Sequence, residues 1–133
     1  MRQVLLVDFM EFRIEFDSTE AKGRILIYEE WKKGKEKRKI LGEQIGSVDF
    51  CVDNVSLTVT SLDVVEKYRR KGLGRLIMGV IFSLAVYYNR KVELVSGNEN
   101  ASKFYRAIGM KPKSKKDSDE FVWKPRKKRN EKS

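Results

Sequence analysis

The chain has 133 residues, room for one compact domain, and its 29 Lys and Arg exceed its 19 Asp and Glu to give a net charge of +10. It contains no histidine and a single cysteine, Cys51, which excludes hydrolases with an imidazole base, zinc sites with four Cys or His ligands, and disulfide frameworks. The longest nearly apolar run, residues 76–88, is too short to span a bilayer, and Asp8 interrupts the apolar stretch after Arg2, which argues against a signal peptide. We therefore expect a cytoplasmic domain without membrane contact, in which Cys51 packs in the fold.

The positive charge is concentrated in two segments. Residues 31–40 and residues 124–133 each carry six basic residues against one glutamate, and the rest of the chain is neutral. Runs of this kind are usually solvated, because they cannot bury enough apolar surface to offset the cost of ordering. We expect a basic loop at 31–40 and a disordered basic tail at 125–133 that follows one domain at 1–124. Both segments are also candidates for an acidic or nucleic-acid partner.

The first half of the chain predicts β-strands. Residues 3–9, 11–16 and 24–31 are rich in β-forming side chains, with a turn region at 17–23. Residues 48–59 alternate between apolar and polar side chains, as half-buried strands do, and are interrupted by turn residues at Asp53-Asn54.

The alternation changes parity after Val59. The next apolar residues are Leu62 and Val64, and no turn residue intervenes. One extra residue near Thr60-Ser61 would produce this change. The sequence therefore predicts a β-bulge there, which would bend the strand away from a neighbour.

The second half changes to the period of a helix. Residues 72–89 predict a largely apolar helix, and residues 91–96 predict a strand after it, so that a parallel strand–helix–strand crossover is expected. A second helix should begin at Asn98 or Asn100 and end at Gly109.

A last strand is expected at residues 120–123, before Pro125. Taken together, these elements predict an α+β fold. It should be a mixed sheet with antiparallel N-terminal strands and one parallel crossover.

The segment that joins the bulged strand to the long helix is basic and contains two glycines. Its residues are Arg69, Arg70, Lys71, Gly72, Leu73, Gly74 and Arg75. The first amides of a helix lack intrahelical partners and lie at the positive end of its dipole, and glycine allows a phosphate to approach the backbone. The segment is thus a candidate diphosphate site, although it lacks the Lys and Ser/Thr of a P-loop. An ordinary strand-to-helix turn with surface cations is the alternative.

Two motifs occur here in order, separated by one helix and one strand. Residues 69–74 have the pattern R/Q-x-x-G-x-G/A, and residues 98–110 have the pattern N-x-x-A-x-x-[LF]-Y-x-x-x-G, followed by methionine. Residues 55–112 resemble, through these motifs, the GNAT superfamily of acetyl-CoA-dependent N-acetyltransferases. The resemblance implies a GNAT-like domain in which the fourth and fifth strands splay apart around the pantetheine arm of acetyl-CoA, and it implies no metal.

The resemblance also implies site residues. The backbone of Leu62, Asp63 and Val64 would bind pantetheine, residues 69–75 would surround the diphosphate, and Asn98 would hold the cofactor near the start of the second helix. Tyr105 occupies the position of the general acid that would protonate the departing thiolate. From its spacing alone, Tyr105 is equally an aromatic residue packed on an amphipathic helix.

Glu93 is the candidate general base. It lies inside residues 92–95, where a buried parallel strand should be apolar, and a carboxylate there suggests a wet cleft. Its position five residues before Asn98 is similar to that of the catalytic glutamate in the ribosomal-protein N-terminal acetyltransferases of the superfamily. The alternative is a glutamate paired with a nearby Lys or Arg, and Asp49 and Asp63 are the other candidate bases.

One departure from the family concerns its acceptor site. The family places two helices between its first two strands, whereas this chain has only the turn region at 17–23. An open acceptor groove suits a protein N-terminus or lysine better than a small amine, and the basic segment 31–40 would supply part of the missing wall.

The expected function is therefore acetyl transfer from acetyl-CoA to a primary amine, by direct attack in a ternary complex. Two alternatives stay open. One is acetylation of a small-molecule amine, and the other is a non-catalytic GNAT-fold module that binds nucleic acid or protein through its basic segments.

Overall fold

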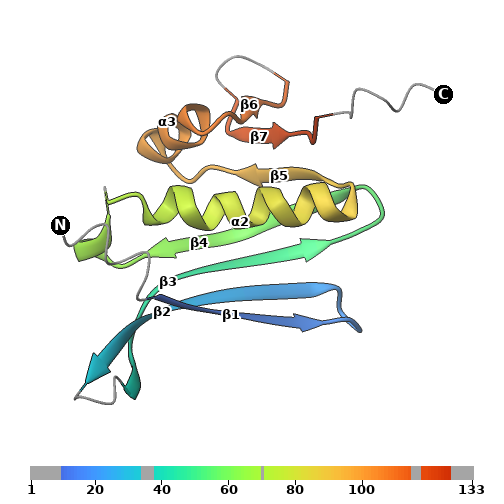
Figure 1. The fold of residues 1–133 in the computed structure, drawn as a ribbon. Coiled ribbons are helices and arrows are strands. Elements are labelled where there is room, and N and C mark those ends of the chain that lie inside the picture. The colour runs from blue at the N-terminus through green and yellow to red at the C-terminus, as the bar shows by residue number, and fades with distance from the viewer. Residues whose placement is uncertain (1–9, 34–37, 70, 115–117, 127–133) are drawn as a thin grey trace.

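The computed structural model describes residues 10–33, 38–69, 71–114 and 118–126 (Figure 1). These residues form one seven-stranded sheet of order β1-β2-β3-β4-β5-β7-β6, with helices packed against it. The elements are β1 (Met10–Asp17), β2 (Lys22–Lys33), β3 (Arg38–Val52), β4 (Ser56–Val64), the 3-10 helix η1 (Glu66–Tyr68), α2 (Leu73–Tyr88), β5 (Lys91–Val95), α3 (Glu99–Ala107), β6 (Lys111–Pro112) and β7 (Glu120–Trp123).

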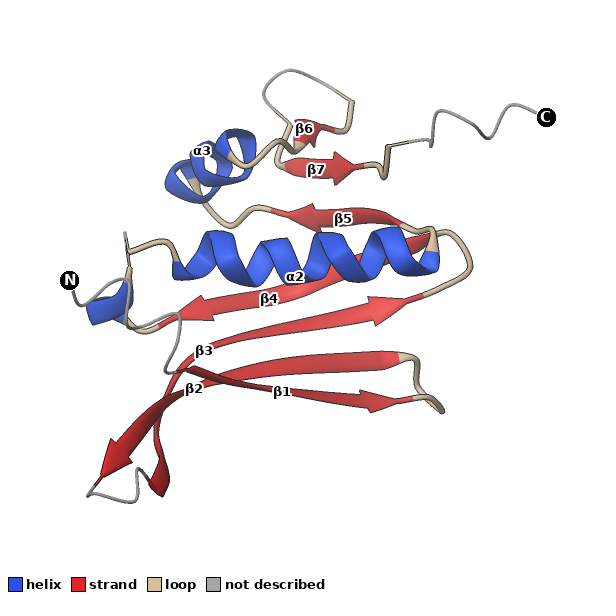
Figure 2. Cartoon of the chain, in the orientation of Figure 1, coloured by secondary structure: helices blue, strands red, loops and turns tan. Residues whose placement is uncertain are grey.

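The sheet is mixed, as the sequence predicted. Strands β1 to β4 pair antiparallel in chain order, β4 pairs parallel with β5, and β7 pairs antiparallel with both β5 and β6. Helix α2 makes the crossover from β4 to β5 (Figure 2). The predicted α+β fold is confirmed, and β6 is an additional short strand that the sequence did not indicate.

The predicted β-bulge is also confirmed. On β3 and β4, Asp49 lies opposite Ser61, and the next pair joins Phe50 to Val59. Thr60 is therefore the extra residue on β4. An extra residue on one strand of an antiparallel pair increases the local bend and twist.

The prediction of a basic loop at residues 31–40 is wrong for most of that segment. Strand β2 continues to Lys33 and β3 begins at Arg38, with Trp31 paired to Ile40 and Lys32 paired to Lys39. The backbone ladder of a long hairpin holds these residues extended, and a run of charges does not prevent such pairing. The predicted strand at 3–9 and the tail from residue 127 lie outside the described residues.

Both helices cover the same face of the sheet. Phe82 of α2 stacks on Trp123 of β7, and a Cβ added to Gly74 of α2 would lie 3.3 Å from the ring of Phe104 in α3. The core lies between these helices and the sheet, where the largest fully buried side chains are Phe121, Ile25, Ile27, Ile45, Leu57, Ile77, Met78, Ile81, Val48 and Val92. The other face carries charged side chains such as Arg24, Asp49 and Glu93 and, within the described residues, no helix.

Two glycines of α2 should respond differently to alanine. A Cβ at Gly79 meets nothing within 4 Å, whereas a Cβ at Gly74 crowds the Phe104 ring. Alanine favours a helix interior over glycine by about 0.5–1 kcal/mol, so Gly79→Ala should raise the free energy of unfolding by about that amount. Gly74→Ala should gain less, because the ring must shift. Equal gains in urea unfolding would contradict the close approach of the two helices.

Candidate functional site

The central strands β4 and β5 separate partway along their length. Their parallel pairing runs from Ser56 opposite Lys91 to Val59 opposite Leu94, and β4 then continues past its bulge to Val64. This leaves a slot between the second half of β4 and the end of β5, as the resemblance predicted.

The backbone orientation of β4 decides which residues serve the slot. The Val65 amide donates to the Ile45 carbonyl at 3.0 Å, and the Asp63 carbonyl lies 3.4 Å from the position of a Cβ built on Gly46. Because alternate residues of a strand direct their amides and carbonyls to opposite edges, Asp63 faces β3 while Leu62 and Val64 face the slot. Of the three positions predicted to bind pantetheine, only these two present backbone groups to it.

The N-terminus of α2 lies beside the end of β4. Gly72 precedes the helix with φ of +87°, in the left-handed region that favours glycine. The first helical bond runs from the Leu76 amide to the Gly72 carbonyl, which leaves the amides of residues 73–75 without intrahelical partners. Among the described residues, no side chain caps this end and the first turn has no acidic residue to offset the positive end of the helix dipole.

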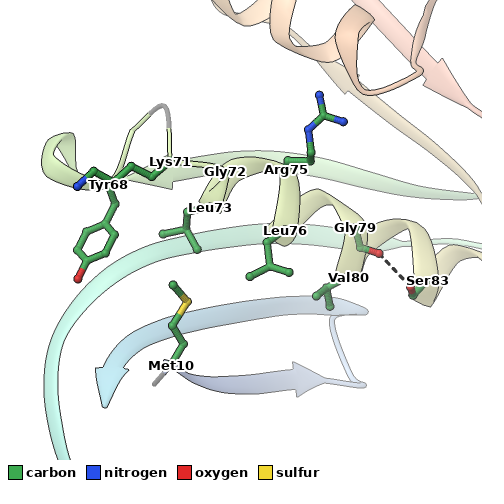
Figure 3. Close-up of a pocket in the computed structure, with 10 residues that line it drawn as sticks. All are labelled: Met10, Tyr68, Lys71, Gly72, Leu73, Arg75, Leu76, Gly79, Val80 and Ser83. Carbon is green, nitrogen blue, oxygen red and sulfur yellow. Dashed lines mark hydrogen bonds between the residues drawn. The ribbon is translucent and has the colours of Figure 1, made fainter. Parts of the chain in front are cut away.

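Cationic side chains surround this helix end. Arg69 donates from Nε to the Val64 carbonyl at 2.9 Å, which places its guanidinium at the end of the slot. Lys71 and Arg75 are exposed, and Arg75 points away from Leu76 (Figure 3). Arg70 lies outside the described residues, so its predicted role stays a prediction.

A largely apolar pocket lies between α2 and β1, and Lys71, Gly72 and Arg75 of the helix end also line it. Its volume is about 550 Å³, and its walls include Met10, Leu76 and Val80 (Figure 3). At one end the hydroxyl of Tyr68 donates to the buried carboxylate of Glu29. The pocket therefore borders the same N-terminus of α2 as the cationic side chains described above.

Tyr105 combines a packed ring with an accessible hydroxyl. The ring is buried in the core, with its centroid 5.3 Å from that of Phe104 and 5.9 Å from that of Phe121. Burial raises the pKa of the phenol above its ordinary value of 10.0. Within the described residues no buried side-chain polar atom lacks a partner, and none of them bonds to this hydroxyl, so it reaches solvent-accessible space.

Glu93 lies on the helix-free face of the sheet. Its carboxylate is 3.1 Å from Lys113 Nζ and 3.3 Å from Lys91 Nζ, and it accepts a hydrogen bond from Ser56 Oγ at 3.4 Å. Desolvation raises the pKa of this carboxyl, but the two lysines together outweigh it and lower the pKa below its ordinary value of 4.5. The lysine pairing that the sequence left as an alternative is therefore present.

Asn98 caps helix α3, as the sequence predicted. Its Oδ1 accepts the Ala101 amide at 2.8 Å, which satisfies one of the first amides of the helix. Nearby, the buried hydroxyls of Ser96 and Ser102 are 2.6 Å apart and tie the end of β5 to α3. Sequence reasoning missed this pair, although two serines that flank a cap residue were a usable signal.

The remaining candidates have other environments. Asp49 forms an ion pair with Arg24 at 2.7 Å, Asp63 is exposed on β4, and Cys51 is half-buried in β3. The described residues contain no group of three or more His, Cys, Asp or Glu side chains that could hold a metal ion. None of the described helices is long and apolar enough to cross a membrane.

No protein-family model matches the sequence, and no curated protein matches it significantly. Solved structures do match. AtaTR bound with acetyl-CoA is 14% identical over 88% of this chain and 94% of that chain, with a TM-score of 0.64. AtaT complexed with acetyl-methionyl-tRNAfMet is 14% identical over 80% and 72%, with a TM-score of 0.57. The anti-CRISPR protein AcrVA5 is 14% identical over 59% and 90%, with a TM-score of 0.54. The chain therefore has the GNAT fold, and the fold predicted from the two motifs is confirmed.

Proposed function

We propose that the chain transfers an acetyl group from acetyl-CoA to a primary amine. The observation that carries this proposal is the slot that opens beyond Val59 and Leu94 and ends beside the uncapped N-terminus of α2. An extended amide-bearing arm and a diphosphate are the two chemical parts that such a site would accept together.

The residues at the slot fit acetyl-CoA. The backbone groups of Leu62 and Val64 would bond to the pantetheine amides, much as a neighbouring strand would. The free amides of residues 73–75, together with Lys71 and Arg75, would bind the diphosphate. The Val64 carbonyl already accepts from Arg69, so this arginine would share or release that acceptor when the arm binds.

The proposed reaction requires no nucleophile from the protein, only groups that remove and donate a proton. The neutral amine attacks the thioester carbonyl, a C–N bond forms, the C–S bond breaks, and the thiolate takes a proton. We assign that proton to the Tyr105 hydroxyl, and we assign removal of the amine proton to Glu93, directly or through water. Because Glu93 lies on the helix-free face, the acceptor would approach from that side, which suits an amine on a protein N-terminus or lysine.

One observation favours a second class of acceptor. Lys91 and Lys113 flank Glu93 and place positive charge where the amine must arrive. This charge disfavours polyamines and would attract an amine that is attached to a polyanion, such as an aminoacyl-tRNA. A solved structure shows AtaT complexed with acetyl-methionyl-tRNAfMet, which is the acetylated form of such an amine.

Binding of acetyl-CoA tests the cofactor site. The ligand should raise the thermal midpoint of the wild type, because it binds only the native state. Gly72→Glu would place a carboxylate at the diphosphate position and should abolish the ligand-induced shift. Gly72→Ala is the matched control: at φ of +87° alanine is also strained, so both variants should be less stable, but the alanine variant should keep its shift. A full shift in Gly72→Glu would refute the assignment.

Release of free thiol from acetyl-CoA identifies the acceptor. The assay compares peptides with free N-termini, lysine peptides with blocked N-termini, polyamines and aminoacyl-tRNA. Release of thiol with any one amine supports acetyl transfer. The amines that cause release show whether the acceptor is a protein amine or an aminoacyl-tRNA. Binding of acetyl-CoA without release for any amine would favour the non-catalytic module.

A further inference from the structure

Strand β1 lies at one edge of the sheet formed by the described residues. Among the described residues it pairs with β2 alone, over its full length of eight residues and without a register shift. It contains no proline and no bulge. Proline and bulges are two of the devices that keep a free strand edge from pairing with another chain, and charged side chains, which β1 does carry, are a third.

The helix-facing side of β1 is apolar and incompletely covered. Phe12, Ile14 and Phe16 alternate on this side, because Phe12 lies opposite Ile27 and Ile14 lies opposite Ile25 in β2. Both β2 partners are fully buried, whereas Ile14 is 57% and Phe16 is 53% exposed. Helix α2 lies over β3, β4 and β5 and leaves the end of β1 uncovered (Figure 1). Two large apolar side chains on the core side of a sheet therefore lack cover.

The opposite side of β1 carries alternating charges. Glu11, Arg13 and Glu15 follow one another at every second residue, and Arg13 contacts Glu11 at 2.5 Å while it lies over the ring of Tyr28. Because opposite residues of paired strands share a face, the positions of these charges distinguish the registers in which a second β1 could pair antiparallel with the edge.

Two antiparallel registers place Arg13 opposite a glutamate: those centred on Phe12 and on Ile14. The register centred on Phe12 pairs Arg13 with Glu11, but it leaves the exposed Phe16 opposite no described residue of the second copy. The register centred on Ile14 pairs both exposed apolar side chains, Ile14 and Phe16.

With Ile14 opposite Ile14 of a second copy, Arg13 lies opposite Glu15 and Phe12 lies opposite Phe16, and each of these pairs occurs twice by symmetry. Centring the pair on Arg13 would place arginine opposite arginine, and centring it on Glu15 would place glutamate opposite glutamate. The chosen register also places Glu11 opposite Asp17, but the Asp17 carboxylate accepts the Thr19 amide at 2.9 Å within its own turn.

We propose that β1 pairs with β1 of a second copy of this chain across a two-fold axis, centred on Ile14. The two sheets would then be continuous, with the helices of both copies on the same side. The exposed Ile14 and Phe16 side chains would pack against those of the second copy. This inference goes beyond the proposed acetyl transfer and does not depend on it.

The molar mass of the full chain, measured by sedimentation equilibrium over a range of concentrations, tests the proposal. The wild type should reach the mass of a dimer. Ile14→Lys would place two ammonium groups opposite each other at the axis and should weaken association at least tenfold. Val55→Lys, at a residue that is 60% exposed in the β3–β4 turn, should leave association unchanged. A wild type that stays monomeric at about 100 µM would overturn the proposal, because the dissociation constant would then lie far above that concentration.

A charge-reversal cycle tests the register itself. Arg13→Glu places like charges opposite Glu15 at both symmetric positions and should weaken the dimer about tenfold. Adding Glu15→Arg to that variant restores opposite charges across the axis and should recover most of the lost affinity. Dissociation constants that are unchanged in both Arg13→Glu and Ile14→Lys would overturn this interface. A double variant that dimerises no more tightly than Arg13→Glu alone would also overturn it.

Discussion

Replacing Tyr105 with phenylalanine should slow acetyl transfer by roughly 10²- to 10⁴-fold, the usual effect of removing a general acid. The substitution deletes only the hydroxyl and keeps the ring contacts with Phe104 and Phe121. Burial raises the pKa of the phenol, so it remains protonated over the working pH range and has a proton to donate. Single-turnover kinetics with saturating acetyl-CoA measure this step without interference from product release.

Stability separates chemistry from packing at the same residue. Tyr105→Phe should change the free energy of unfolding little, because no described residue bonds to the hydroxyl. Tyr105→Ala removes a ring from the core and should cost on the order of 3–5 kcal/mol. Full activity of Tyr105→Phe, together with a large stability loss in Tyr105→Ala, would leave only the packing role.

Sequence patterns predicted those elements of the fold that are determined by residues close together in the chain. The period of 3.6 residues and the glycine at its start located α2 to within one residue at each end, because an amphipathic helix and its caps are encoded over neighbouring positions. The parity change after Val59 located the bulge at Thr60, since side chains in a strand must alternate between faces.

Non-local pairing explains the main errors. The basic segment at 31–40 looks like a solvated loop in isolation, but a long β2–β3 hairpin extends through it. Nothing within that segment indicates how far two distant strands stay in register. The run of charges was wrongly taken to predict a loop, because a charged residue does not prevent its backbone from pairing in a strand.

In the candidate site, too, features encoded by neighbouring residues were predictable and contacts between distant residues were not. The motif at residues 69–74 indicated the turn before α2, and Asn98 indicated the cap of α3. The ion pair of Glu93 with Lys113 was not predictable, because Lys113 is twenty residues away in sequence and reaches Glu93 only through the β6–β7 hairpin. Likewise, the orientation of the Asp63 backbone toward β3 follows from one hydrogen bond, Val65 to Ile45, that the sequence does not show.

Glu93→Gln is the second substitution with a large expected effect. It keeps the size of the side chain but removes the proton acceptor, so kcat should fall by roughly 10²- to 10⁴-fold while the affinity for acetyl-CoA stays unchanged. Asp63→Asn is the matched control, because it neutralises an exposed carboxylate on the neighbouring strand β4. A loss of turnover in Asp63→Asn, with full activity in Glu93→Gln, would move the base to Asp63.

The pH dependence of stability tests the ion pairs of Glu93, and kcat at neutral pH then separates a base from a purely structural carboxylate. The pKa of Glu93 is lower in the folded chain than its ordinary value of 4.5, so its ion pairs stabilise the fold above that pH, and this contribution is lost as pH falls through the folded pKa. The free energy of unfolding of the wild type should therefore fall more steeply below pH 4.5 than that of Glu93→Gln. A structural role alone predicts this difference in acid with no change in kcat at neutral pH. A catalytic base predicts both the difference in acid and a fall in kcat at neutral pH, where the two lysines hold the carboxylate ionised but also lower its basicity.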